Sequence, residues 1–154
     1  MFTKLNLELG RIQRLGPCYL FLKGSGQVAS STLVVGEQFS IGGPETVRGY
    51  SQSEFLGDSG FVLSAELRTP FFVGMETVNK YVQWAFFYDH GYVHRAQPMP
   101  GETSSSDLSA YGAGLRFTFP HDFNIRLDVG FPIKGDQPSD NKSSQVWLQA
   151  VKKF

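Results

Sequence analysis

The sequence contains a single cysteine, Cys18, in 154 residues. One cysteine excludes an internal disulfide and a cysteine pair that could bind a metal. Fourteen basic and fourteen acidic residues give a formal net charge of zero, so the chain has no general attraction for nucleic acid or acidic membranes. The histidines, His90, His94 and His121, are not spaced as metal ligands. No phosphate-binding loop occurs either. We predict no metal, no cofactor and no nucleic-acid partner.

Long apolar runs are also missing. No stretch of about 18 apolar residues exists, so the sequence predicts no transmembrane helix. The N-terminal stretch MFTKLNLELGRIQRL lacks the apolar centre of a signal peptide. Aromatic residues, in contrast, are abundant, with 14 Phe, 6 Tyr and 2 Trp. Many aromatics in a slightly polar chain are typical of a membrane β-barrel, whose residues face lipid and lumen alternately.

Most of the chain alternates between apolar and polar residues with the period of a β-strand. Seven segments follow this pattern, at about 2–14, 18–34, 60–70, 80–93, 108–119, 123–133 and 144–154. Their lengths are close to the roughly ten residues of a tilted membrane strand. Connections are short at 15–17 and 120–122 but long at 36–60, 94–107 and 134–143. Short turns on one side and long loops on the other are typical of an outer-membrane barrel.

Periodicity alone leaves a second fold open, a soluble antiparallel sandwich or lipocalin-like barrel, because both folds alternate with period two. Two features favour the membrane fold. The faces opposite the apolar ones carry small or polar residues and several glycines. Large aromatics stand at the ends of the apolar faces, namely Phe61, Tyr88, Phe119, Phe123 and Phe131. We predict an all-β fold, an antiparallel membrane β-barrel.

The connection at about 36–60 is longer than the roughly 12–15 residues usual for a passive loop. It is rich in glycine, and Pro44 excludes a central strand. Its apolar residues are too many to leave in water, so it should pack against the sheet: Phe39, Ile41, Val47, Tyr50, Phe55 and Leu56. Arg48 needs a planar anionic partner there. Strand parity places Glu66 and Asp89 on polar faces that Arg48 can reach.

The stretches GEQFSIGGPETVRGY at 36–50 and GDSGFVLSAELRTPFF at 57–72 resemble a conserved loop and strand of the TpsB transporters. These haemolysin secretion/activation proteins are outer-membrane pores of bacterial two-partner secretion, in the Omp85 superfamily. The resemblance implies a sixteen-stranded barrel preceded by POTRA domains. Residues 1–154 would be its C-terminal part, the last seven strands, with the POTRA domains and first strands absent.

The same resemblance implies that the loop folds into the barrel. The arginine of Val47-Arg48-Gly49-Tyr50 would meet the acid of a Phe-x-Asp motif, here Phe87 to Asp89, with Glu66 nearby. An alternative interpretation is that residues 47–50 are only a turn and that Glu66 pairs with Arg68. Phe154 resembles the C-terminal aromatic that the barrel assembly machinery reads. The alternative for Phe154 is an ordinary residue at the membrane interface.

The expected function is a pore in the bacterial outer membrane that secretes or activates a TpsA-type exoprotein, in contact with outer-membrane lipid. An Omp85 insertase and a passive surface-antigen or binding barrel are the alternatives. We predict no enzymatic activity. Asp89 and His90 beside the serines at 104–106 have the residue types of a hydrolase triad, but nothing in the sequence orients them.

Overall fold

The computed structural model describes residues 3–72 and 74–153. Seven antiparallel strands form one sheet in the order β1-β2-β5-β6-β7-β8-β9, so each strand pairs with the next long strand of the chain. Their bounds are β1 Lys4–Leu15, β2 Cys18–Ala29, β5 Ser59–Pro70, β6 Val82–His94, β7 Ser105–Phe119, β8 Phe123–Gly135 and β9 Gln145–Lys152. The seven predicted segments and the antiparallel all-β fold are confirmed, although β2 ends earlier and β7 begins earlier than expected.

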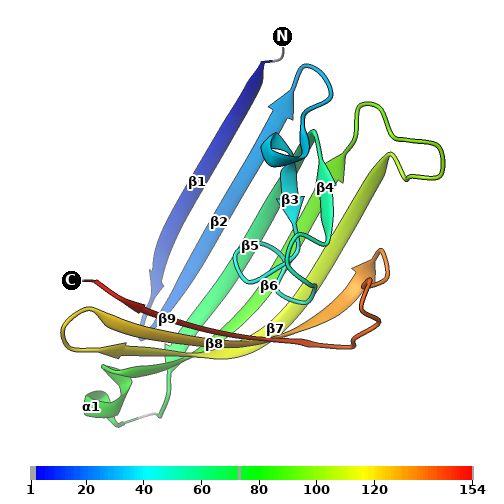
Figure 1. Ribbon diagram of the computed structural model, residues 1–154. Helices are drawn as coiled ribbons and strands as arrows, with labels where there is room; N and C mark the ends of the chain where they lie inside the picture. Colours follow the sequence, from blue (N-terminus) through cyan, green and yellow to red (C-terminus); the bar gives the residue numbers. More distant parts are fainter. Residues whose placement is uncertain (1–2, 73, 154) are drawn as a thin grey trace.

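The sheet curls strongly along its width, so that β8 and β9 run across the direction of β1 and β2 (Figure 1). In the described part of the chain β1 and β9 each pair on one side only, and the sheet is open between them. The segment between β2 and β5 lies over the inner side of the curve (Figure 1). This wall-like curvature is what a stretch of barrel requires.

The two faces of the sheet are arranged opposite to those of a water-soluble protein. On β6, Trp84, Phe86 and Tyr88 are 38%, 47% and 49% exposed. On the opposite face of the same strand, Phe87 is 5% exposed and Asp89 is fully buried. A soluble sandwich would bury the aromatic face and expose the charged one. The outward apolar face therefore favours the membrane barrel over the soluble alternative.

The connection between β2 and β5 has local structure that the sequence did not predict. A 3₁₀ turn, η1 (Val35–Glu37), leads into a small hairpin of β3 (Phe39–Ile41) and β4 (Phe55–Gly57). The only α-helix in the described residues is α1 (Glu76–Asn79), between β5 and β6. No helix in residues 3–72 and 74–153 is long and apolar enough to cross a bilayer.

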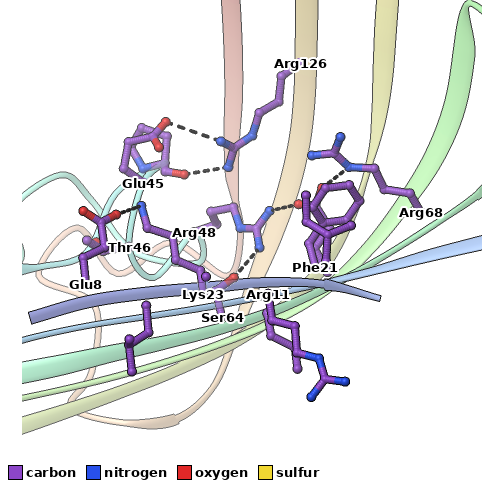
Figure 2. Close-up of a pocket in the computed structure, with 16 residues that line it drawn as sticks. Glu8, Arg11, Phe21, Lys23, Glu45, Thr46, Arg48, Ser64, Arg68 and Arg126 are labelled. Atoms are coloured by element: carbon purple, nitrogen blue, oxygen red, sulfur yellow. Dashed lines mark hydrogen bonds and ion pairs between the residues drawn. The ribbon is translucent and has the colours of Figure 1, made fainter. Parts of the chain in front are cut away.

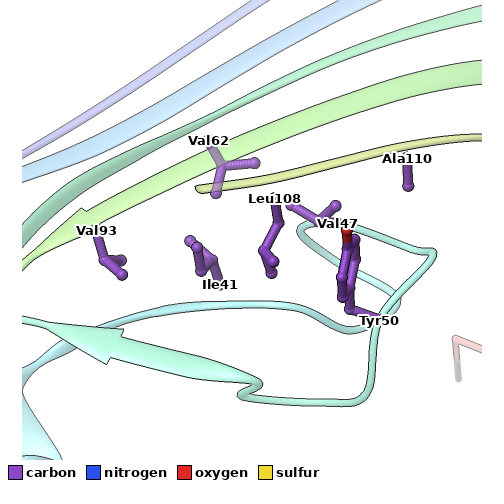
Figure 3. Packing of buried hydrophobic residues seen from close by; sticks show 7 residues of the cluster. All are labelled: Ile41, Val47, Tyr50, Val62, Val93, Leu108 and Ala110. Carbon is purple, nitrogen blue, oxygen red and sulfur yellow. The ribbon is translucent and has the colours of Figure 1, made fainter. Parts of the chain in front are cut away.

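The hydrophobic core lies between this hairpin segment and the inner face of the sheet (Figure 3). The segment contributes Ile41, Val47 and Tyr50, each at most 1% exposed. The strands contribute Val62, Val93, Leu108 and Ala110. The expectation that the loop packs against the sheet is confirmed for these three residues of the segment and for Phe39 and Phe55, which pack against the cluster, but not for Leu56. Removal of this apolar surface from water fixes the segment in place.

Asp58 joins the base of this segment to the neighbouring connections. Its carboxylate accepts hydrogen bonds from the backbone N–H of Leu33 at 2.7 Å and of Ala96 at 2.8 Å. Burial alone would raise the pKa of Asp58, but these hydrogen bonds and one from Gln38 outweigh burial and lower it below its ordinary value of 3.8. The ionised carboxylate therefore stabilises the base of the segment.

Replacing Asp58 with Asn tests this anchor. The lowered pKa means that the stabilisation is complete above the ordinary pKa and is lost as the pH falls through the folded-state pKa. We expect hydrogen exchange at Leu33 and Ala96 to be faster in Asp58→Asn than in the parent at about pH 7. The difference should shrink as the pH falls below about 4. A difference independent of pH would show that the carboxylate charge is not the anchor.

Candidate functional site

Arg48 lies at the tip of the hairpin segment, between β3 and β4, and is 3% exposed. Its neighbour Val47 accepts hydrogen bonds at its carbonyl from the N–H of Gly43 and of Tyr50, both at 3.2 Å. Val47 and Tyr50, which flank Arg48 in the sequence, are buried in the core (Figure 3). These contacts fix the backbone of the tip and direct the guanidinium toward the inner face of β5 and β6.

The guanidinium is hydrogen-bonded to two carboxylates and lies 3.6 Å from a third, that of Asp128. Arg48 Nε and Nη2 donate to the two oxygens of Asp89 at 2.7 and 2.8 Å, a bidentate pair. Nη1 donates to Glu66 Oε2 at 2.6 Å. The guanidinium carbon lies 3.5 Å from the centroid of the Phe87 ring, a cation–π contact. The structure thus places Glu66, Phe87 and Asp89 around Arg48.

Ser64 completes the contact with Asp89. Its hydroxyl donates to Asp89 Oδ1 at 2.6 Å and accepts from Arg48 Nη2 at 3.1 Å. The backbone N–H of Arg48 also donates to Asp89, at 3.2 Å. Sequence reasoning assigned no role to Ser64. Its place two residues before Glu66 on the same face of β5 could have indicated one, because alternate residues of a strand share a face.

A second group of charges extends this site across the sheet. Arg116 on β7 donates to both oxygens of Glu66, at 2.6 and 3.1 Å, and to Asp128 on β8 at 2.7 Å. Arg68 pairs with Glu66 at 2.8 Å. Arg126 pairs with Asp128. It also pairs with Glu45 of the hairpin segment (Figure 2). Glu66 therefore binds Arg68, as the alternative interpretation expected, and binds Arg48 and Arg116 as well.

Sequence reasoning did not identify Arg116, Arg126 or Asp128 as members of this site. Their alternation placed them on polar faces, but contact between strands depends on register, which alternation does not determine. In the structure Arg116 lies opposite Arg126, and Gly114 lies opposite Asp128. Only this register brings Arg116 close enough to bind Asp128.

The tip also contacts β8 and β9 through its backbone. Trp147 Nε1 on β9 donates to the carbonyl of Arg48 at 2.9 Å. A Cβ atom at Gly130 would lie 2.5 Å from that carbonyl oxygen, and one at Gly49 would lie 2.6 Å from the Cβ of Ala110. Both positions therefore require glycine for the close approach. Trp147 and Gly130 were missed by sequence reasoning.

The site is densely charged and almost fully buried. Glu66, Asp89 and Asp128 are 7%, 0% and 0% exposed, and Arg48 and Arg116 are 3% and 6% exposed. Burial lowers the pKa of Arg48, but the hydrogen bonds and charge of Asp89 and Glu66 outweigh burial and raise it above its ordinary value. Arg48 therefore stays charged. Loss of one partner from such a buried network typically costs about 3–5 kcal/mol.

The hydrolase residues are not brought together. Asp89 faces the inner side of the sheet and binds Arg48, whereas His90 faces the outer side, as successive strand residues must. His90 Nδ1 lies 2.9 Å from the hydroxyl of Ser109, not from the serines at 104–106. Within residues 3–72 and 74–153, no group of three His, Cys, Asp or Glu side chains could hold a metal ion. Phe154 lies outside the described residues.

Comparison with known proteins adds a family and a fold. The family model for "Haemolysin secretion/activation protein ShlB/FhaC/HecB" matches residues 2–117. Among solved structures, CdiB from Acinetobacter baumannii is similar, with a TM-score of 0.65 and 23% identity. The match covers 97% of this chain and 26% of CdiB, so the chain spans about a quarter of that relative. No curated protein gives a significant match.

Replacing Gly130 with Ala should displace the tip, because the added methyl group would overlap the Arg48 carbonyl. We expect faster hydrogen exchange across residues 43–52 and loss of the hydrogen bond from Trp147. Gly10→Ala is the matched control, since a Cβ at Gly10 would meet nothing within 4 Å. Unchanged exchange at 43–52 in Gly130→Ala would contradict the close seating of the tip on β8.

Proposed function

Because this chain belongs to the ShlB/FhaC/HecB family of haemolysin secretion/activation proteins, we propose that it forms part of an outer-membrane pore that secretes a partner exoprotein. The exposed apolar outer face contacts outer-membrane lipid, and the buried polar face lines the lumen. In this proposal the partner is of the TpsA type and crosses the pore from periplasm to cell surface. The barrel assembly machinery inserts the protein.

The observation that carries the proposal is the burial of Arg48 among carboxylates of the inner wall. A loop held there occupies the space that an exported polypeptide must use. A hollow of about 610 Å³ lies beside the tip and is lined by sixteen residues, which include Glu8, Phe21, Lys23, Arg68 and Arg126 (Figure 2). The hollow is therefore lined by charges of both signs.

The family match favours secretion over the insertase alternative. A passive surface-antigen or binding barrel has no need of a loop held in its lumen by an arginine. Deleting the gene distinguishes a secretion pore from a passive barrel, since a secretion pore is required for the partner to reach the medium. Deletion of a passive barrel would leave secretion unchanged.

Arg48→Ala should lower secretion of the partner severalfold, because the tip loses its contacts with Asp89 and Glu66. Partner in the culture medium and pore protein in the outer membrane are measured together by immunoblotting. We expect normal assembly with reduced secretion. Arg14→Ala is the control, because Arg14 is exposed and donates only to the Gly16 carbonyl of its own turn.

An exchange of charges tests the pair itself. The double variant Arg48→Asp with Asp89→Arg restores an ion pair between the same two positions, with the positive and negative side chains exchanged. It should recover part of the secretion that each single variant loses. Secretion no better than in the single variants would count against the Arg48–Asp89 pair as the functional contact.

A further inference from the structure

Every side chain within hydrogen-bonding or stacking distance of the Arg48 guanidinium belongs to the sheet. Ser64 and Glu66 come from β5, and Phe87 and Asp89 come from β6. We call these four residues the guanidinium cage. The hairpin segment supplies the guanidinium and one backbone N–H, and no wall of the cage. All four side chains of the cage therefore stay on the sheet when the tip moves away.

The carboxylates of the site differ in which ion pairs remain if Arg48 leaves. Glu66 retains Arg68 and Arg116. Asp128 retains Arg116 and Arg126. In the described part of the chain, Asp89 forms ion pairs with Arg48 alone, and its remaining hydrogen bond is from Ser64. Withdrawal of the tip thus leaves Asp89 as a carboxylate without a cation, which is the costly half of breaking a buried pair.

We propose that the cage is a guanidinium receptor that an arginine of the exported polypeptide occupies as the tip withdraws. The inference rests on the proposed secretion function and identifies what replaces Arg48. Exchange of one guanidinium for another keeps Asp89 and Glu66 paired throughout. An arginine on a chain confined in the lumen competes well with the tethered Arg48, because confinement raises its effective concentration to the millimolar range.

The geometry selects arginine over lysine. Asp89 accepts two N–H groups in parallel, Glu66 accepts a third, and Phe87 stacks on the flat face of the guanidinium. A lysine ammonium cannot make the bidentate contact or stack in the same way. The hollow beside the tip, lined by Ser64, Glu66 and Arg48 itself, gives a peptide access to the cage (Figure 2).

The test uses the full-length protein in lipid nanodiscs and three capped tripeptides, Gly-Arg-Gly, Gly-Lys-Gly and Gly-citrulline-Gly. In Arg48→Ala, where the cage is vacant, Gly-Arg-Gly should bind and slow hydrogen exchange in β5 and β6. The lysine peptide should bind about tenfold more weakly, and the uncharged citrulline peptide should not bind. Asp89→Asn in the same background should abolish the preference for arginine.

The parent protein provides a second measurement that needs no empty cage. Gly-Arg-Gly should accelerate exchange across residues 43–52 by displacing the tip, whereas Gly-citrulline-Gly should not. Equal effects of the arginine and lysine peptides on hydrogen exchange, or effects that persist in Asp89→Asn, would overturn the proposal that the cage is a guanidinium receptor. Failure of these peptides while the partner still requires this protein for export rejects the receptor alone. Export unaffected by gene deletion rejects the proposed function instead.

Discussion

The burial of an arginine between Asp89 and Glu66 constrains the rest of this structure. A charged group removed from water must be matched by groups held in the right geometry, or the fold is lost. The inner wall meets this condition with a network that crosses from β5 to β8. Apolar packing of Val47 and Tyr50 positions the arginine, and the small glycines of the wall let the backbone approach. Each of these features is required by the buried charge.

The outer face of the sheet, in contrast to the charged inner face, is apolar. The leucines of β1 and the outward aromatics of β6, Trp84, Phe86 and Tyr88, remain exposed, and no layer of the described chain covers them. The sheet thus has an apolar outer face, which is stable only where the surroundings are also apolar. In the proposed pore lipid covers this face, while the hydrophobic core lies on the inner side beneath the hairpin segment.

Much of this arrangement could be predicted from the sequence, because its signals are local. Alternation along the strands located all seven, and parity placed Glu66 and Asp89 on the same side as the loop arginine. The hairpin of β3 and β4 was missed because strands of three residues are too short to show a period. Trp147 and Gly130 were missed because their roles depend on how β8 and β9 align with a tip about a hundred residues earlier.

The hydrogen bond from Trp147 joins residues 99 positions apart, whereas Glu66 lies 18 positions from Arg48. Pairings across long stretches of chain form late, because more chain entropy is lost before they are made. The contacts of the arginine tip are therefore complete only once β9 has joined the sheet. The tip is thus fixed on the inner face by the same event that adds β9 to the sheet.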